Sequence, residues 1–286
     1  PVRPGAGRRT VGSGAVSTTD ERPAAERTLP LDPTLPSDQE YALGRAINGL
    51  REDDPLCSAS VPVTGWQRAV LWSLLVIVIG CAVWQPLNTA VVLIGLCTAG
   101  YLVTMLDRVL IFRQGLASRA IVISEERARA IPDHELPPYT ILVPAYNEPE
   151  VVGDLIGAMA NLTYPRDKLQ VLLLLEADDD VTIAAAKDCA DSDAITILLV
   201  PPADPRTKPK ACNYGLYFST GEIVTIFDAE DLPEPLQLRR VVAAFNDLGP
   251  EVACVQAKLV YHNGHQNILT GWFTAEDGRR LGYLLP

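Results

Sequence analysis

Two hydrophobic patterns divide the chain. From Ala69 to Leu106 no residue is charged, and this run is too long for one membrane span, which takes about 20 residues. Pro86, near its middle, has no backbone N–H to donate and favours a break in a helix. The run therefore predicts two membrane spans, residues 69–84 and 89–106, joined by a tight turn. A buried helical hairpin in a soluble protein is the less favoured interpretation.

Basic residues near the predicted spans indicate their orientation, because loops on the cytoplasmic side carry an excess of Lys and Arg. Arg68 precedes the first span, whereas Arg108, Arg113 and Arg119 follow the second. The turn between the spans carries none. We therefore expect a multi-pass membrane protein with both termini in the cytoplasm.

After Pro138 the pattern changes to short apolar runs that alternate with helical segments. Continuous apolar strands between helices are typical of a parallel sheet that is covered on both faces. The sequence thus predicts an α/β fold, mainly parallel and Rossmann-like, after a two-helix transmembrane hairpin. The predicted strands are 139–144, 169–175, 195–200, 223–227 and 252–260, and the predicted helices are 150–162, 182–189, 210–218 and 236–248.

The chain as a whole reads as five consecutive segments. Its first part is rich in Pro, Gly, Arg, Ser and Thr without apolar periodicity, which is typical of disorder. A capping-box pattern, Ser37 with Glu40, then predicts a short amphipathic helix before the membrane. The predicted segments are 1–36 disordered, 37–66 short helical, 67–112 transmembrane hairpin, 113–138 linker, and 139–286 the α/β domain.

Charge and cysteine content exclude several classes of protein. The 286 residues carry a formal net charge of −11, so the chain lacks the basic face that nucleic-acid binding needs. No two of the six cysteines lie close together, which argues against a zinc site and for reduced thiols. His262 and His265 form an HxxH pair, but without a third ligand nearby we do not expect them to bind a metal.

Carboxylates gather where the predicted strands end. Glu148 follows the first strand, residues 176–180 follow the second as Glu-Ala-Asp-Asp-Asp, and residues 228–231 follow the fourth as Asp-Ala-Glu-Asp. The carboxyl ends of parallel strands meet at one crevice, where packed like charges need a counter-charge. Mg²⁺ or Mn²⁺ is the simplest one. An Asp after a strand can instead cap the next helix, and Asp180 fits that role.

Basic side chains supply the opposite charge. Arg206, Lys208 and Lys210 lie in a proline-rich loop just before a predicted helix. Lysines at a helix N-terminus are unfavourable for the helix dipole, so they suggest an anionic partner such as a diphosphate. A solvated basic loop is the alternative. No GxGxxG or GxxxxGK[ST] motif is present, which gives no support to dinucleotide or Walker-type phosphate sites.

Four motifs in order resemble the family 2 inverting glycosyltransferases with the GT-A fold. They are Pro-Ala-Tyr-Asn-Glu at 144–148, the acidic cluster at 176–180, Lys-Pro-Lys-Ala-Cys-Asn at 208–213 and Phe-Asp-Ala-Glu-Asp at 227–231. More narrowly, the chain is similar to the membrane-embedded bacterial branch, the cellulose-synthase-like enzymes and their relatives among inner-membrane phage-adsorption proteins. This resemblance implies a protein of the bacterial inner membrane with its catalytic domain in the cytoplasm. The resemblance covers about residues 139–286, an incomplete GT-A nucleotide-sugar-binding domain.

The resemblance implies a role for each motif. Asp228 and Glu230 fall on the family's DxD pair, with Asp231 as a second possible ligand of a Mg²⁺ or Mn²⁺ ion. Lys210 falls on a lysine that faces the donor, and Cys212 replaces a glycine of that motif. The implied donor-binding residues are Pro144, Ala145, Tyr146, Glu148, Glu176, Asp178, Asp179, Lys208, Lys210 and Asp228.

The implied activity is transfer of a sugar from a UDP-sugar or similar nucleotide donor to a glycan or lipid acceptor. The family's later acidic base and its Gln-x-x-Arg-Trp motif are missing, and Glu276 and Asp277 follow Asp228 too closely to replace that base. We therefore expect the chain to stop before the acceptor half, with no catalytic base. A non-catalytic membrane module that binds nucleotides or acts as a receptor is an alternative. A nucleotidyltransferase is another, although it usually has a Gly-rich basic first loop.

Overall fold

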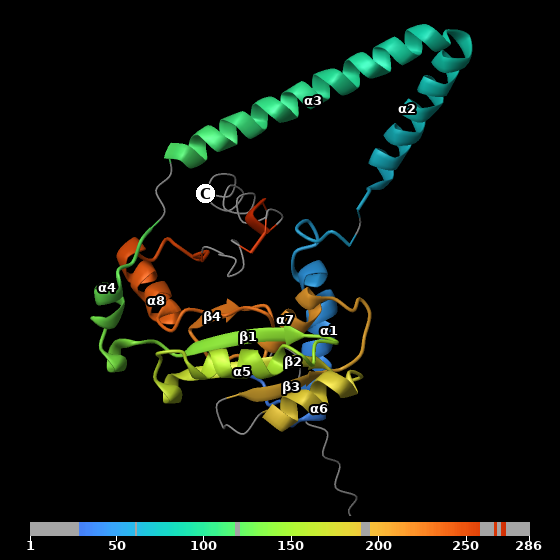
Figure 1. Ribbon diagram of the computed structural model, residues 1–286. Coiled ribbons are helices and arrows are strands. Elements are labelled where there is room, and N and C mark those ends of the chain that lie inside the picture. Colours follow the sequence, from blue (N-terminus) through green and yellow to red (C-terminus); the bar gives the residue numbers. More distant parts are fainter. Residues whose placement is uncertain are drawn as a thin grey trace, which may run out of the picture. The chain divides into compact units, whose positions relative to one another are not determined.

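The structure of the chain is a computed structural model, shown in Figure 1. It describes residues 29–60, 62–117, 121–189, 195–257, 266–267 and 270–272. The chain forms two compact units, each made of segments that are distant in the sequence. The first unit combines Pro1–Gly49, Pro138–Ile156 and Gln170–Asp231. The second combines Leu50–Pro137, Gly157–Leu169 and Leu232–Pro286.

A four-stranded sheet is the centre of the first unit. Its strands are β1 (Tyr139–Ala145), β2 (Leu169–Glu176), β3 (Thr196–Val200) and β4 (Ile223–Ile226), in the order β3-β2-β1-β4. β4 pairs with β1 in parallel, and β3 pairs with β2 in parallel. The α/β class and the parallel sheet that the apolar runs predicted are therefore confirmed, with strand limits that differ by one residue.

The middle strands are buried along nearly their whole length, as their uninterrupted apolar sequence requires. Residues 171–175 of β2 are all less than 4% exposed. The helices that follow the strands are α5 (Val152–Ala160), α6 (Asp180–Cys189), α7 (Lys208–Leu216) and α8 (Gln237–Leu248), with a short 3₁₀ helix at Arg166–Lys168. Tyr214 of α7 packs beside Leu142 and Leu174 in one core cluster. This contact packs α7, whose first turn carries two lysines, against the sheet.

Helix α1 (Pro36–Asp53) belongs to the same core as the sheet. Its small residues Ala42 and Ala46 are buried in the cluster that holds α7. The N–H of Leu31, just before α1, donates to the carbonyl of Tyr217 at 2.8 Å. The Tyr41 ring meets the edge of the Tyr217 ring at a centroid distance of 6.0 Å. The helix that the sequence placed before the membrane is thus a cover on the α/β unit (Figure 1).

Two long apolar helices lie in the second unit, α2 (Gly65–Trp84) and α3 (Pro86–Ala117). Both are long and apolar enough to cross a membrane, and none of the apolar window in either is buried against protein. Pro86 is the first residue of α3, a position where its missing N–H costs nothing. This finding matches the predicted break, although both helices extend beyond the predicted spans.

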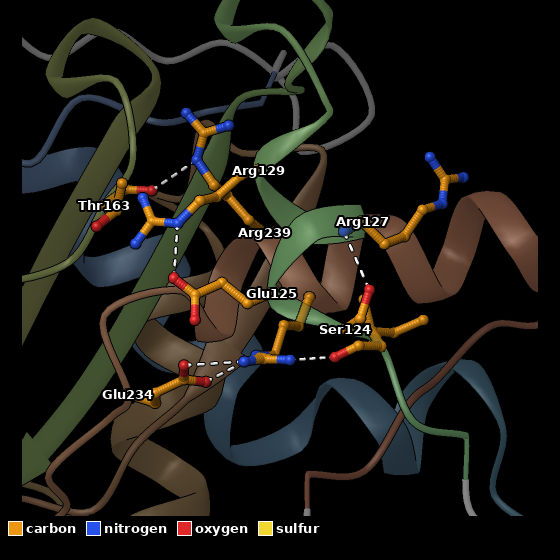
Figure 2. A network of polar contacts seen from close by, with 9 residues as sticks. Ser124, Glu125, Arg127, Arg129, Thr163, Glu234 and Arg239 are labelled. Atoms are coloured by element: carbon orange, nitrogen blue, oxygen red, sulfur yellow. Dashed lines mark hydrogen bonds and ion pairs between the residues drawn. The ribbon is translucent and has the colours of Figure 1, made fainter.

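Arginine side chains join the segment after α3 to α8 within the second unit (Figure 2). This segment holds helix α4 (Glu125–Arg129) and a 3₁₀ helix at Asp133–Glu135. The guanidinium of Arg239 is almost completely buried, donates to the carbonyls of Thr163 and Ile131, and pairs with Asp133. Arg240 pairs with Glu234. Since α4 is only five residues long, these contacts and packing hold the segment in place.

One predicted strand is not observed. The sequence predicted a strand over residues 252–260, but residues 252–257 form no strand and residues 258–260 lie outside the described part. A strand needs a hydrogen-bonded neighbour, and the apolar pattern alone cannot supply one. Residues 1–28, Arg119, His262, His265, Glu276 and Asp277 also lie outside the described residues.

Candidate functional site

The predicted site residues of the first unit lie after the ends of neighbouring strands. β1 ends at Ala145, β2 at Glu176 and β4 at Ile226. Because paired parallel strands share a direction, the loops that follow them meet at one edge of the sheet. This edge is where an open α/β sheet binds its ligands. The strand order therefore brings the three acidic loops together, as the sequence predicted.

Each basic residue of the segment Arg-Thr-Lys-Pro-Lys reaches a carboxylate of these loops. Arg206 pairs with Asp178, with 2.5 Å between Nη1 and Oδ2. Lys208 contacts Asp228 with its ammonium group. Lys210 pairs with Glu176, with 2.8 Å between Nζ and Oε1. Three carboxylates of these loops therefore each have a basic side chain of the same chain beside them.

The Lys210–Glu176 pair is the buried one. The side chain of Lys210 is 1% exposed and that of Glu176 is 9% exposed. Nζ of Lys210 also donates to the carbonyl of Ala203 at 3.1 Å. The pair therefore ties β2, the proline-rich loop and α7 together inside the protein. A role for Lys210 and Glu176 in donor binding stays a prediction, and in this structure their charged groups face each other.

Asp179 has a local structural task. Its carboxylate accepts the N–H of Thr182 at 3.1 Å, as an N-cap of α6 does, and the N–H of Asn147 at 2.5 Å. Burial on its own raises the pKa of Asp179, but the hydrogen bonds from Thr182 and Asn147 outweigh it and lower the pKa. The sequence placed such a cap at Asp180, one residue too late. Asp179 thereby fixes the turn after β1.

The turn after β1 takes its shape from these bonds. Asn147 adopts a positive φ of 55°, a conformation that Asn tolerates better than most residues. The N–H of Glu148 donates to the hydroxyl of Thr182 at 3.1 Å, which leaves the exposed Tyr146 and Glu148 side chains at the edge of the sheet. The hydrogen bond and the charge of Asp178 raise the pKa of the Arg206 guanidinium, and those of Tyr146 add a smaller rise. Pro144 and Ala145 end β1 itself.

The segment after β4 forms a tight acidic turn. Oδ2 of Asp231 accepts the N–H of Asp228 at 2.8 Å, and Glu230 is exposed. Burial raises the pKa of Asp231, and the charge of Lys208 opposes that rise. Within the described residues, no three His, Cys, Asp or Glu side chains form a group that could hold a metal ion. Asp228 and Asp231 still fit Mg²⁺ or Mn²⁺, because such ions are often held by one or two carboxylates together with substrate phosphates.

A threonine and a proline, on either side of Lys208, define the start of helix α7. The hydroxyl of Thr207 accepts the N–H of Lys210 at 3.4 Å, and Pro209 occupies the first turn. Proline there has no N–H that needs a partner. Threonine followed two residues later by proline is the cap signal that places the start of α7 at Lys208, and the sequence prediction put that start two residues later. The Lys208 side chain is 45% exposed, so its charge is open to a ligand.

The structure thus defines a parallel α/β sheet that brings carboxylates and basic side chains together at its carboxyl edge. The family model described as "Glycosyltransferase like family 2" matches residues 137–280. The chain therefore belongs to this family, and the resemblance found in its motifs is confirmed.

Named relatives agree with this assignment. The probable glycosyltransferase YdaM of Bacillus subtilis is 29% identical over 145 residues, which is 50% of this chain and 34% of YdaM. The probable glucomannan 4-beta-mannosyltransferase 7 of rice, Oryza sativa, is 33% identical over 153 residues, 51% of this chain and 25% of that protein. The chain thus spans a third or less of these relatives' length.

A solved structure was also found to be similar. It is described as "Mannosyltransferase PcManGT from Pyrobaculum calidifontis in complex with GDP-Man and Mn2+". It shares 30% sequence identity with a TM-score of 0.40, covering 52% of this chain and 42% of that one.

Proposed function

We propose that the intact protein is a membrane-anchored glycosyltransferase that moves a sugar from a nucleoside diphosphate donor to a glycan or lipid acceptor with inversion. Family membership supports the class of reaction. The observation that carries the proposal is the set of alternating charges at the carboxyl edge of the sheet, where Arg206 and Lys208 expose cationic groups beside Asp178 and Asp228. A diphosphate with a divalent cation matches both signs of charge.

Each side chain has a defined task in this proposal. Arg206 and Lys208 bind the phosphate oxygens of the donor, because both are half-exposed and cationic. Asp228 and Asp231 would hold Mg²⁺ or Mn²⁺, which supplies charge stabilisation for the departing diphosphate. Tyr146, exposed after β1, lies at the same edge and offers a ring to the nucleoside. The buried Lys210–Glu176 pair holds the loop that carries Arg206.

The names of the relatives suggest which sugar to test as the donor. The plant relatives are described as probable glucomannan 4-beta-mannosyltransferases, which makes a hexose the sugar to test. The sequence resemblance points to a UDP-sugar, so UDP is the first probe. GDP is the second nucleoside diphosphate to test. Helices α2 and α3 support a membrane anchor with the α/β domain on the cytoplasmic side, where nucleotide sugars are made.

The proposal predicts metal-dependent binding that needs Asp228. In calorimetric titrations of the full chain in detergent, UDP or GDP should bind with Mn²⁺ present and about tenfold or more weakly with a chelator. Asp228→Asn should remove the metal dependence, because the amide keeps the shape but loses the charge that holds the cation. Glu222→Gln is the matched control, since Glu222 is an exposed acid before β4 and away from the strand end.

Two results of these titrations would contradict the proposal. Binding of neither nucleotide, or binding that neither the chelator nor Asp228→Asn changes, would refute the metal-dependent donor site. Release of labelled sugar from the bound donor would separate a transferase from a module that only binds nucleotides.

A further inference from the structure

The three ion pairs at the carboxyl edge differ in how easily they can exchange partners. Lys210 and Glu176 are buried and hydrogen-bonded to each other, so separating them would leave two unpaired charges inside the protein. The side chains of Arg206 and Asp178 are 48% and 37% exposed, and those of Lys208 and Asp228 are 45% and 58% exposed. Exposed pairs contribute little stability. Lys208 and Arg206 can therefore leave their carboxylates at low cost.

Lys208 differs from Arg206 and Lys210 because its partner is a carboxylate that is proposed to hold the metal ion. It contacts Asp228, which lies first in the acidic turn after β4. Lys208 therefore neutralises a carboxylate that is proposed to hold the divalent cation. An ammonium group and a metal ion beside the same carboxylate repel each other, so a cation that binds Asp228 weakens the Lys208–Asp228 pair.

We propose that Lys208 is a placeholder for the divalent cation, which neutralises Asp228 in the donor-free protein and moves to the donor diphosphate when the cation takes its place. This inference rests on the proposed function and adds a mechanism to it. No bond is made or broken; two ion pairs, ammonium with carboxylate and cation with diphosphate, exchange partners. The protein thereby avoids a bare cluster of carboxylates when it is empty.

The exchange makes the binding of cation and nucleotide mutually dependent. A cation that binds alone must displace Lys208 and leave its ammonium without a partner. A nucleoside diphosphate that binds alone must compete with Asp228 for Lys208. When both bind, each frees the group that the other needs, so each raises the affinity of the other by the same factor. Lys208 is the positioning residue that carries this coupling.

The experiment measures that coupling in the full chain in detergent. Mn²⁺ is titrated alone and with saturating UDP or GDP, whichever binds, and the nucleotide is titrated with and without Mn²⁺. In the unmodified protein we expect the nucleotide to strengthen Mn²⁺ binding about tenfold or more. In Lys208→Met, Mn²⁺ alone should bind several-fold more tightly, because its competitor is gone. The same variant should bind the nucleotide more weakly, and the coupling factor should fall to the part that direct contact between Mn²⁺ and the diphosphate supplies.

Two further variants complete the test. Lys208→Arg keeps the charge and should keep most of the coupling. Lys187→Met removes an exposed lysine of α6 outside the site and should leave all four affinities unchanged. Since Lys208 is half-exposed, its variants should fold, which an unchanged thermal unfolding midpoint would show.

The two ways to fail can be told apart. If the unmodified protein binds Mn²⁺ and nucleotide but Lys208→Met leaves Mn²⁺ binding and the coupling unchanged, the placeholder role is refuted and the proposed function survives. If the unmodified protein binds neither, the proposed function fails and this inference fails with it.

Discussion

At the scale of single residues, buried polar groups are where the structure adds most to the sequence interpretation. The sequence marks Lys210, Glu176 and Asp179 as charged residues at strand ends, which suggests ligand contacts. The structure gives each a protein partner: Lys210 and Glu176 have each other, and Asp179 caps α6. A sequence shows which residues carry charge, but the three-dimensional approach of residues 176 and 210 decides how that charge is used.

Tyr214 provides a stability prediction at this scale. Its side chain is fully buried, and among the described residues its hydroxyl is the buried side-chain group without a hydrogen-bond partner. An unsatisfied buried hydroxyl costs free energy, so Tyr214→Phe should raise the free energy of unfolding by about 1 kcal/mol. Tyr139→Phe is the control, because the Tyr139 hydroxyl bonds to that of Thr225 at 2.6 Å. This second change should lower the free energy of unfolding, measured by denaturant titration at neutral pH.

The same tyrosine predicts a pH dependence. Burial raises the pKa of Tyr214 from 10.0 to about 12. The unfolded chain therefore loses this proton at a lower pH than the folded chain, and the folded state binds more protons between these two values. Stability must then fall as the pH rises from about 10 to about 12. Tyr214→Phe should make this fall less steep, and an identical slope in both proteins would contradict the assignment.

At the scale of elements, α1 is the clearest addition that the structure makes. It packs small side chains, Ala42 and Ala46, against a core that also holds α7. The amide of Asn213 in α7 donates to the carbonyl of Ala46 at 3.4 Å. Since α7 carries Lys208 in its first turn, the packing of α1 contributes to where that lysine sits.

A charge placed in this contact should disrupt it. Ala46→Glu would bury a carboxylate without a partner, so we expect a loss of several kcal/mol of stability or failure to fold. Gly44→Glu adds the same group to the same helix, where an added Cβ meets nothing within 4 Å, and should be nearly neutral or slightly stabilising. The thermal unfolding midpoints of the two variants make the comparison. Equal midpoints would show that α1 is not part of the core.

Element types were predictable from the sequence to a large extent, because most of them depend on local periodicity. The strands at 139, 169, 196 and 223 follow apolar runs, and the break at Pro86 follows from proline's missing N–H. The covering role of α1 was not predictable, because a stripe of alanines does not say which surface it meets. The strand predicted at 252 failed in its described part, since pairing depends on a neighbour that periodicity does not reveal.

For the candidate site, the sequence predicted which loops meet but not how their charges pair. The acidic loops do lie at one edge, because the strands that they follow are neighbours in one sheet. The pairing of Arg206, Lys208 and Lys210 with three different carboxylates depends on the path of the proline-rich loop. No spacing rule encodes that path, so the sequence could not predict which basic residue meets which carboxylate.

At the scale of the whole molecule, the two apolar helices raise the question of topology. α2 is 20 residues long and the apolar part of α3 is 28 residues long, enough to cross a hydrocarbon core of about 30 Å. Arg68 and Arg108 flank this pair, so the rule that basic loops stay inside predicts that both ends of the chain lie in the cytoplasm.

Reporter fusions test this topology in bacterial cells. Alkaline phosphatase, which is active only outside the cytoplasm, should be inactive when fused after Pro286. The same enzyme inserted after Gln85, between the two helices, should be active. The reverse pattern would place the α/β domain outside the cytoplasm, away from nucleotide sugars, and activity at neither position would argue that the helices do not span the membrane.

The packing of α1 on the sheet also has a consequence for synthesis on the ribosome. The partners of Ala46 in the core include Phe218, which is made some 170 residues later. At translation rates of about 5–20 residues per second, α1 waits roughly ten to thirty seconds for its binding surface. During that wait both apolar helices emerge from the ribosome. A stripe of alanine and glycine is suited to this delay, because it exposes little apolar surface to chaperones or to neighbouring chains.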